Sequence, residues 1–245
     1  MREVADSGSD IRQFFPDHRF FNFSSFLGDH ILALLSKANV QIQYVEPYLE
    51  IASDHEPVFQ FGQSMRPLAY PRQVHSDRIM LADHSGVYLE SDGIITANPE
   101  LMIRIKVADC VPVFVHDPEN RLKALIHSGW RGTINRITTK GLTRLIELGS
   151  RMNDIKIVLG PSIKKKNYIV QDDVAKHFRN KNKEKSLMGW NIDMIGEIED
   201  DLISMGVRSD QIFSPDICSY KSNECHSFRR DGNNSGRMYA YMGDV

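Results

Sequence analysis

The sequence has few cysteines and no excess of charge. It has three cysteines, Cys110, Cys218 and Cys225, and this small and odd number argues against a disulfide-stabilised scaffold. Thirty Lys and Arg residues stand against 32 Asp and Glu residues, which gives a formal net charge of −2. This balance argues against a broad basic surface, so we expect no nucleic-acid partner. A binding site for a small anion such as phosphate would have to be local.

Long apolar runs are missing as well. The run at residues 111–115 is typical, and it is far shorter than the roughly 20 residues that cross a bilayer. Residues 1–10 are polar and acidic, without the basic start and apolar core of a signal peptide. Neither end carries a lipidation motif. These features predict a cytoplasmic protein with no membrane partner.

Internal repeats, low-complexity segments and flexible linkers are absent from the sequence. Hydrophobic residues make up 41% and charged residues 25%, which is typical of a folded globular chain. Since no Gly-, Ser- or Pro-rich segment separates two halves, we expect a single domain over residues 1–245. The sequence gives no indication of the oligomeric state.

The hydrophobic pattern from residue 71 onwards predicts strands that alternate with helices. Strands are expected at residues 101–107, 111–115, 122–126, 155–159 and 212–213. One amphipathic helix is expected from about residue 134 to its end at Gly149, with Ile146 on the buried side. A second is expected over residues 192–205, capped by Asn191, ended by Gly206 and with Ile203 buried.

The pattern before residue 71 is weaker. A short helix at residues 31–35 and strands at 42–48 and 58–61 are its best interpretation. Together, the expected elements predict an α/β or layered α+β fold, in which a mixed sheet is flanked by helices.

Three short segments place metal-binding or nucleophilic side chains at the ends of predicted strands. His75 ends an Arg-Gln-Val-His segment, Cys110 ends Ala-Asp-Cys, and His127 begins His-Ser-Gly-Trp-Arg-Gly. Strand ends can present side chains to a cleft from a rigid frame. The intervals between the three residues are much longer than the short paired spacings of a zinc finger. Any common site must therefore be assembled by folding.

These residue types are compatible with three interpretations. Two imidazoles and a thiolate match a zinc site of the Cys-His₂ type, which leaves a position for water or substrate. Alternatively, Cys110 is a nucleophile and His127 is its base, without a metal. Thirdly, the residues have only structural roles. Asp109 can support the neighbouring Cys110 only if the strand bends there, because adjacent strand residues point to opposite faces.

Arginines accompany glycines in two segments. Residues 129–132 lead into a predicted helix, so their backbone N–H groups and Arg131 predict a local anion site. The alternative is that the glycines only form the turn and Trp130 packs in the core. Near the C-terminus, Arg229 and Arg230 follow Phe228 on a loop. Surface charge and a role in substrate binding are both compatible with that loop.

Taken together, these segments resemble a known family. The similar motifs are, in order, Gln-Val-His at 73–75, Ser-Asp-Gly-Ile-Ile-Thr at 91–96, Ala-Asp-Cys-Val-Pro-Val at 108–113, His-Ser-Gly-Trp-Arg-Gly at 127–132, Gly-Pro at 160–161 with Tyr168 and Val170, and Ser-Phe-Arg-Arg-Asp at 227–231. They occur in this order in the YfiH-like proteins, also called the multicopper polyphenol oxidase or laccase-domain family. The resemblance covers about residues 71–240, and residues 1–70 diverge from the family pattern.

The resemblance implies a YfiH-like α/β domain with a zinc ion held by His75, Cys110 and His127, which are then also the catalytic residues. It implies a purine nucleoside phosphorylase that acts on adenosine, inosine, guanosine and methylthioadenosine, and that also deaminates adenosine by hydrolysis. The expected partners are therefore small molecules, a purine nucleoside and phosphate. Arg131, Arg229 and Arg230 are the expected substrate-binding residues.

The family also includes members linked to the editing of peptidoglycan precursors, and older descriptions report copper-dependent phenol oxidation. Copper is possible but disfavoured here, because a single Cys-His₂ set cannot supply the several copper centres of a four-electron oxidase. Two alternatives remain open. One is a metal-free Cys/His amidase or editing hydrolase for peptidoglycan precursors, and the other is a non-catalytic binding protein that zinc stabilises.

Overall fold

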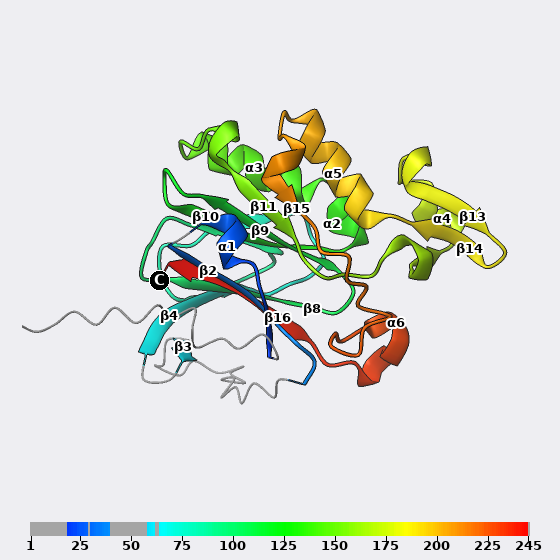
Figure 1. Ribbon diagram of the computed structural model, residues 1–245, viewed down its shortest axis with the longest axis horizontal. Helices are drawn as coiled ribbons and strands as arrows, with labels where there is room; N and C mark the ends of the chain where they lie inside the picture. Colours follow the sequence, from blue (N-terminus) through cyan, green and yellow to red (C-terminus); the bar gives the residue numbers. More distant parts are fainter. Residues whose placement is uncertain (1–18, 29, 40–57, 62–63, 245) are drawn as a thin grey trace, which may run out of the picture.

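The computed structural model describes residues 19–28, 30–39, 58–61 and 64–244, so the strand predicted at 42–48 lies outside the described residues. Two sheets stack on one another, and helices cover the outer face of one of them (Figure 1). The first sheet has the order β1 (Phe20–Asn22), β2 (Ile31–Ser36), β16 (Met238–Asp244), β8 (Met102–Val107), β4 (Ser64–Pro71) and β3 (Val58–Phe61), with β6 (Gly86–Tyr88) beside β4. Its pairs are antiparallel, except that β4 runs parallel to β6 and to β8.

The second sheet carries the candidate site at one end. Its order is β15 (Ile212–Phe213), β11 (Lys156–Leu159), β9 (Val111–Asp117), β10 (Leu122–Ser128), β7 (Gly93–Thr96) and β5 (Ile79–Leu81). The edge pairs β15–β11 and β5–β7 are parallel and the inner pairs are antiparallel. A smaller sheet has the order β12 (Ile169–Val170), β14 (Gly189–Ile192) and β13 (Lys183–Ser186).

The helices are α1 (Ser24–Leu27), α2 (Trp130–Ile134), α3 (Ile137–Glu147), α4 (Asp172–Ala175), α5 (Met194–Ser204) and α6 (Phe228–Asp231). Figure 1 shows α2, α3 and α5 on the side of the second sheet that faces away from the first. Alternation along β10 divides the core between the two layers. Ala124 and Ile126 pack in the cluster with α3 and α5, whereas Leu125 packs between the sheets with Ile103. The predicted mixed sheet flanked by helices is confirmed, with a second sheet added to it.

The predicted strands at residues 58–61, 101–107, 111–115, 122–126, 155–159 and 212–213 are all present. The predicted helix at 31–35 is wrong, because these residues form β2, which is completely buried. Ile31, Ala33 and Leu35 pack between the two sheets, and Leu32 and Leu34 belong to a different apolar cluster. A strand that is apolar on both faces shows no alternation, and therefore it cannot be distinguished from a short buried helix by its pattern.

The two long helices begin and pack differently from the prediction. The first is α3, which begins at Ile137 after the short helix α2, because Arg136 between them adopts a left-handed conformation with φ 59°. Ile146 and Ile203 are largely exposed, so both helices bury a narrower face than predicted. The cap of α5 is Asp193, whose carboxylate accepts a hydrogen bond from the N–H of Gly196, whereas the predicted cap Asn191 lies in β14.

Glycines end these two helices as predicted. Gly149 and Gly206 have φ values of +109° and +95°, which is the left-handed region that terminates helices. Among the described residues, no helix combines the length and the apolar character needed to cross a membrane. That one domain spans residues 1–245 stays a prediction.

Candidate functional site

The pairing of β9 with β10 brings two of the predicted site residues together. In this hairpin Val111 pairs with Ser128 and Pro112 with His127, so Cys110 lies just before β9 beside the end of β10. On the other side of β10, Ile126 pairs with Gly93, which puts Asp92 next to His127. The loop after β4 supplies His75 at the same end of the sheet.

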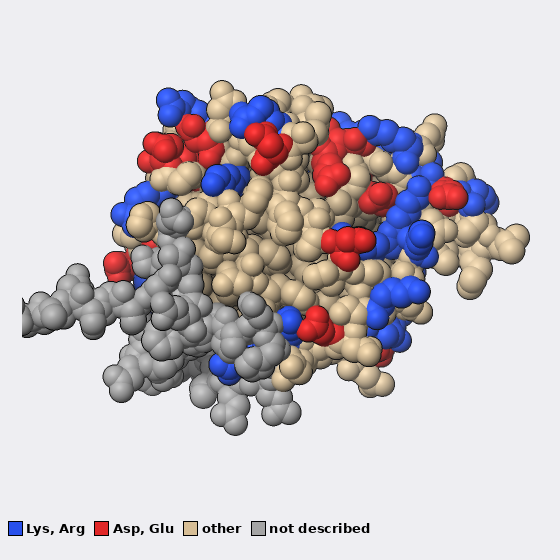
Figure 2. Space-filling model, viewed as in Figure 1, with Lys and Arg blue, Asp and Glu red and all other residues tan. Residues whose placement is uncertain are grey.

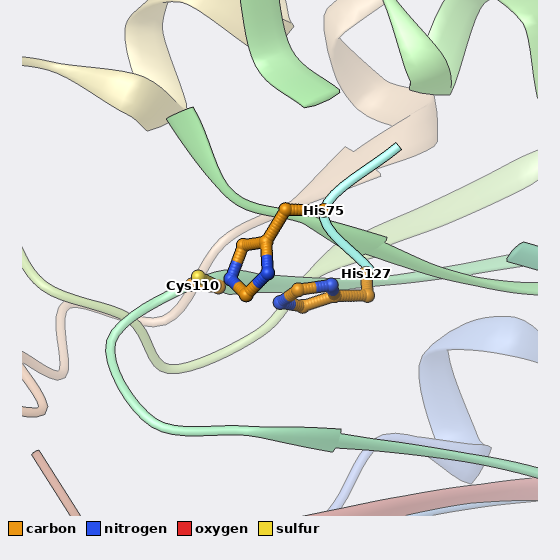
Figure 3. Close-up of side chains that lie close together, drawn as sticks. All are labelled: His75, Cys110 and His127. Atoms are coloured by element: carbon orange, nitrogen blue, oxygen red, sulfur yellow. The ribbon is translucent and has the colours of Figure 1, made fainter. Parts of the chain in front are cut away.

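His75, Cys110 and His127 form one cluster. Their ligand atoms all lie within 4.8 Å of one another, and Figure 3 shows the three side chains directed toward a common point. The rings of His75 and His127 stand 4.9 Å apart at 76°. His75 is exposed, Cys110 is half-buried and His127 is buried, so the cluster has an interior side and an open side.

A glycine makes the close approach possible. A Cβ atom on Gly129 would lie 3.0 Å from the Cys110 sulfur and 3.1 Å from the His75 ring. Any larger residue at this position would press on two members of the cluster. The donor set and this space fit a single tetrahedral metal ion with an open position, as in Cys-His₂ zinc sites.

The electrostatics favour a thiolate beside a protonated imidazole. Burial raises the pKa of the Cys110 thiol, but His127 and His75 outweigh burial and lower it to about 6. Burial lowers the pKa of His127, but the Cys110 thiolate and Asp92 outweigh burial and raise it to about 9. The thiolate is the form that binds a metal and that acts as a nucleophile.

Asp92 is fully buried and makes hydrogen bonds on both sides. Its Oδ1 lies 2.7 Å from Nδ1 of His127 and accepts the N–H of His75 at 3.0 Å. Its Oδ2 accepts the N–H groups of Val74 and Ser76 and the Ser76 hydroxyl. Burial raises the pKa of this carboxyl, but the hydrogen bonds from His127 and Ser76 lower it to about 2. The sequence indicates no role for Asp92 beyond its place in the Ser-Asp-Gly-Ile-Ile-Thr motif at 91–96.

Asp109 does not support Cys110. The chain bends at Asp109, which has φ 79°, as a supporting role requires. However, its carboxylate accepts hydrogen bonds of 2.6 Å from the Ser219 hydroxyl and from the N–H of Arg229. Asp109 therefore holds the segment that carries α6 rather than the Cys110 side chain.

A cavity of about 470 Å³ opens beside the cluster, lined by all three of its members. Its further walls include three arginines, each over an aromatic ring that also lines the cavity. Arg131 lies 4.5 Å from the ring centroid of Trp130, Arg229 5.1 Å from Tyr168, and Arg237 5.8 Å from Phe228. Burial raises the pKa of Tyr168, so its phenol is neutral. The cavity thus combines fixed positive charge with aromatic surface.

Two cations of the α6 region, Arg229 and Arg230, differ in what they contact. Arg229 lines the cavity, together with Arg131 and Lys106 from elsewhere in the chain. The Arg230 guanidinium instead donates hydrogen bonds to the carbonyls of Ser219, Tyr220, Ser222 and Cys225 and to Asp231. It holds the loop before α6, and its predicted contact with substrate stays a prediction. Lys106 is a cavity residue that the sequence did not reveal. It lies in the strand predicted at 101–107, and a charged residue on the polar face of a strand gives no sign of a binding role.

On the face in Figure 2, basic and acidic side chains are interspersed, and basic ones are denser on the side that carries α6 and the smallest sheet. No broad basic surface covers this face among the described residues.

A family model described as multi-copper polyphenol oxidoreductase laccase matches residues 35–243. The chain belongs to this family. The matched residues include the three clustered residues, the cavity lining and the whole second sheet, whereas β1 and most of β2 of the first sheet precede them.

Within the family, the chain is similar to curated proteins named purine nucleoside phosphorylase. One, from Deinococcus radiodurans, is 32% identical over 177 residues, covering 70% of this chain and 68% of the relative. Another, from Clostridium acetobutylicum, is 30% identical over 192 residues, covering 73% of this chain and 78% of the relative.

Solved structures share the fold. The Bacillus licheniformis protein YfiH superposes with a TM-score of 0.72 at 23% identity, covering 87% of this chain and 92% of that one. YlmD from Geobacillus stearothermophilus gives a TM-score of 0.75 at 20% identity, covering 94% and 97%. The YfiH-like fold predicted from the motifs is therefore confirmed.

Proposed function

We propose that this chain is a zinc-dependent purine nucleoside enzyme. It cleaves adenosine, inosine, guanosine and methylthioadenosine with phosphate, and it deaminates adenosine with water. The observation that carries the proposal is the His75–Cys110–His127 cluster beside a cavity of arginines and aromatic rings. Its support from relatives is the similarity to curated proteins named purine nucleoside phosphorylase.

Zinc suits the cluster better than copper does. Imidazole and thiolate ligands are typical of zinc, and the described residues bring together one set of three ligands rather than several. A zinc ion held by these residues would supply a Lewis acid and an acidic bound water. The Cys110 thiolate and the Nε2 face of His127 are available to such an ion, since Nδ1 of His127 is engaged by Asp92.

The cavity walls suit the two substrates. In phosphorolysis a phosphate oxygen bonds to C1′ of the ribose while the bond from C1′ to the purine nitrogen breaks and the purine takes up a proton. Arg131, Arg229 and Arg237 would bind the phosphate, because each guanidinium is held over a ring and stays charged. Phe228 is half-exposed at the cavity and offers a face on which a purine can stack.

Product analysis tests this proposal. Purified protein is incubated with adenosine, with and without phosphate. We expect adenine and ribose 1-phosphate only when phosphate is present, and inosine in both cases. Elemental analysis should find close to one zinc per chain, with much less in His75→Ala and Cys110→Ala. Protein that turns over no purine nucleoside, or that contains no metal, contradicts the proposal.

A metal-free amidase that acts on peptidoglycan precursors is the second candidate, and the lowered pKa of Cys110 beside His127 favours it. Selective labelling of Cys110 by iodoacetamide distinguishes the two. Labelling that is rapid and unaffected by chelators supports the amidase, whereas labelling that appears only after chelation supports the zinc enzyme.

A zinc-stabilised binding protein is distinguished by the same preparations. It would lose thermal stability on chelation and turn over no nucleoside. The cytoplasmic location stays a prediction.

A further inference from the structure

A single buried carboxylate connects the two histidines of the cluster. Oδ1 of Asp92 lies 2.7 Å from Nδ1 of His127 and accepts the backbone N–H of His75 at 3.0 Å. His75 and His127 are far apart in sequence, one in the loop after β4 and the other in β10, so this oxygen is a direct link between them. Both Asp92 and His127 are buried, which keeps water from competing for the hydrogen bond.

The same carboxylate shapes the loop that presents His75. Three consecutive N–H groups, those of Val74, His75 and Ser76, point at its two oxygens, and the Ser76 hydroxyl donates as well. His75 has φ 59°, in the left-handed region that a β-carbon disfavours. The loop keeps this conformation because an anion lies at its centre.

From this geometry we infer that Asp92 is the positioning residue of the metal site proposed above. By accepting the Nδ1 proton of His127, it selects the tautomer whose Nε2 lone pair faces Cys110 and His75. By holding residues 74–76, it sets where the His75 ring stands. The inference rests on the proposed function, since it assigns Asp92 a role toward the proposed metal.

The other aspartate of the site has a separate role. Asp109 is buried too, but its hydrogen bonds go to the Ser219 hydroxyl and to the N–H of Arg229, a residue that lines the cavity. A change from aspartate to asparagine at either position removes one charge and preserves the shape of the side chain. Asp109→Asn is therefore a matched control for Asp92→Asn.

The first experiment measures zinc affinity by competition with a chromogenic chelator. In Asp92→Asn one amide group cannot accept all five hydrogen bonds, and its NH₂ meets another donor. We expect zinc binding to weaken by about 10- to 100-fold, the usual effect of losing a partner of a ligating histidine. Asp109→Asn is expected to keep the zinc affinity of the wild type. Equal zinc affinity in Asp92→Asn and wild type overturns the inference.

The second experiment needs no variant, so it decides the matter if Asp92→Asn fails to fold. Nitrogen-15 NMR of histidine-labelled, zinc-loaded wild type is expected to show His127 with a protonated, slowly exchanging Nδ1 and a metal-bound Nε2. A purely structural Asp92 would not require this tautomer. Coordination through Nδ1 of His127, or an Nδ1 without a proton, overturns the inference.

The proposed function and the inference fail in different ways. Wild type that binds no zinc contradicts the proposed metal site itself, and the inference with it. If wild type and Asp92→Asn bind zinc equally tightly, only the role of Asp92 is contradicted.

Discussion

Cys110 and His127 each change the charge state of the other. The Cys110 pKa is lowered from its ordinary value of 9.0 to about 6, and the His127 pKa is raised from 6.5 to about 9. Because the Cys110 pKa is lowered, its thiolate stabilises the folded protein fully above pH 9, and this contribution is lost as the pH falls through 6. Because the His127 pKa is raised, its imidazolium stabilises the folded protein fully below pH 6.5, and this contribution is lost as the pH rises through 9. The ion pair is therefore populated between about pH 6 and 9.

We predict that alkylation of Cys110 reflects this pair. In chelator-treated protein, the rate of reaction with iodoacetamide should fall as the pH is lowered, with a midpoint near pH 6, because the thiolate persists to that pH. Cys225, which is buried with its pKa raised by burial to about 11, should react slowly throughout and serves as the internal control. A midpoint for Cys110 near the ordinary thiol value contradicts the ion pair.

Gly129 sets the space between Cys110 and His75. We predict that Gly129→Ala weakens zinc binding, because the new β-carbon would press on the Cys110 sulfur and the His75 ring. Gly160→Ala is the control, since its β-carbon would meet Pro112 instead. Zinc content and melting temperature are measured for both. Unchanged zinc content in Gly129→Ala would show that the cluster is wider than described.

At the scale of elements, the β9–β10 hairpin and the strand pairing beside it bring the cluster together. The sequence predicts both strands and the three clustered residues, because a buried strand and its terminal His or Cys are visible locally. It does not reveal Asp92, whose role depends on the pairing of β7 with β10. It also does not separate Arg229 from Arg230, because both follow Phe228 and only their contacts in the fold differ.

The short helix α6 gives a test of that difference. We predict that Arg229→Ala raises the KM for phosphate by about 10- to 100-fold, the loss of one charge-assisted hydrogen bond. Its backbone N–H remains to bind Asp109. Arg230→Ala should instead lower the melting temperature, since its guanidinium holds the carbonyls of the preceding loop. Steady-state kinetics with varied phosphate and thermal melts are measured for both. The reverse pattern contradicts the assignment of these two residues.

At the scale of the whole molecule, the stacking of one layer of helices on two sheets explains why β2 is not recognisable as a strand from the sequence. Both faces of β2 are buried and apolar, so its sequence shows no alternation of polar and apolar residues. The separation of α3 from the short helix α2 depends on Arg136, a residue type that gives no local signal for a left-handed conformation. Fold class is visible in the alternation of elements, whereas the second sheet arises from long-range pairing.

The interface between the sheets should dominate stability. Phe114 is fully buried there and lies 5.3 Å from the ring of Phe23. We predict that Phe114→Ala lowers the free energy of unfolding by about 3–5 kcal/mol, as large cavities in cores do. Phe213→Ala, at a ring that is 41% exposed and contacts Phe26 at the edge of the core, is the control and should lower the free energy of unfolding by much less. Denaturant titrations measure both, and a small loss for Phe114→Ala would contradict a tightly packed interface.

The proposed purine nucleoside chemistry depends on zinc held by the His75–Cys110–His127 cluster. The most direct measurement is the release of hypoxanthine and ribose 1-phosphate from inosine by purified protein, before chelation, after chelation and after zinc is added back. We predict release that requires phosphate, stops on chelation and returns with zinc. Absence of release from zinc-loaded protein, or release that chelation leaves unchanged, would contradict the claim.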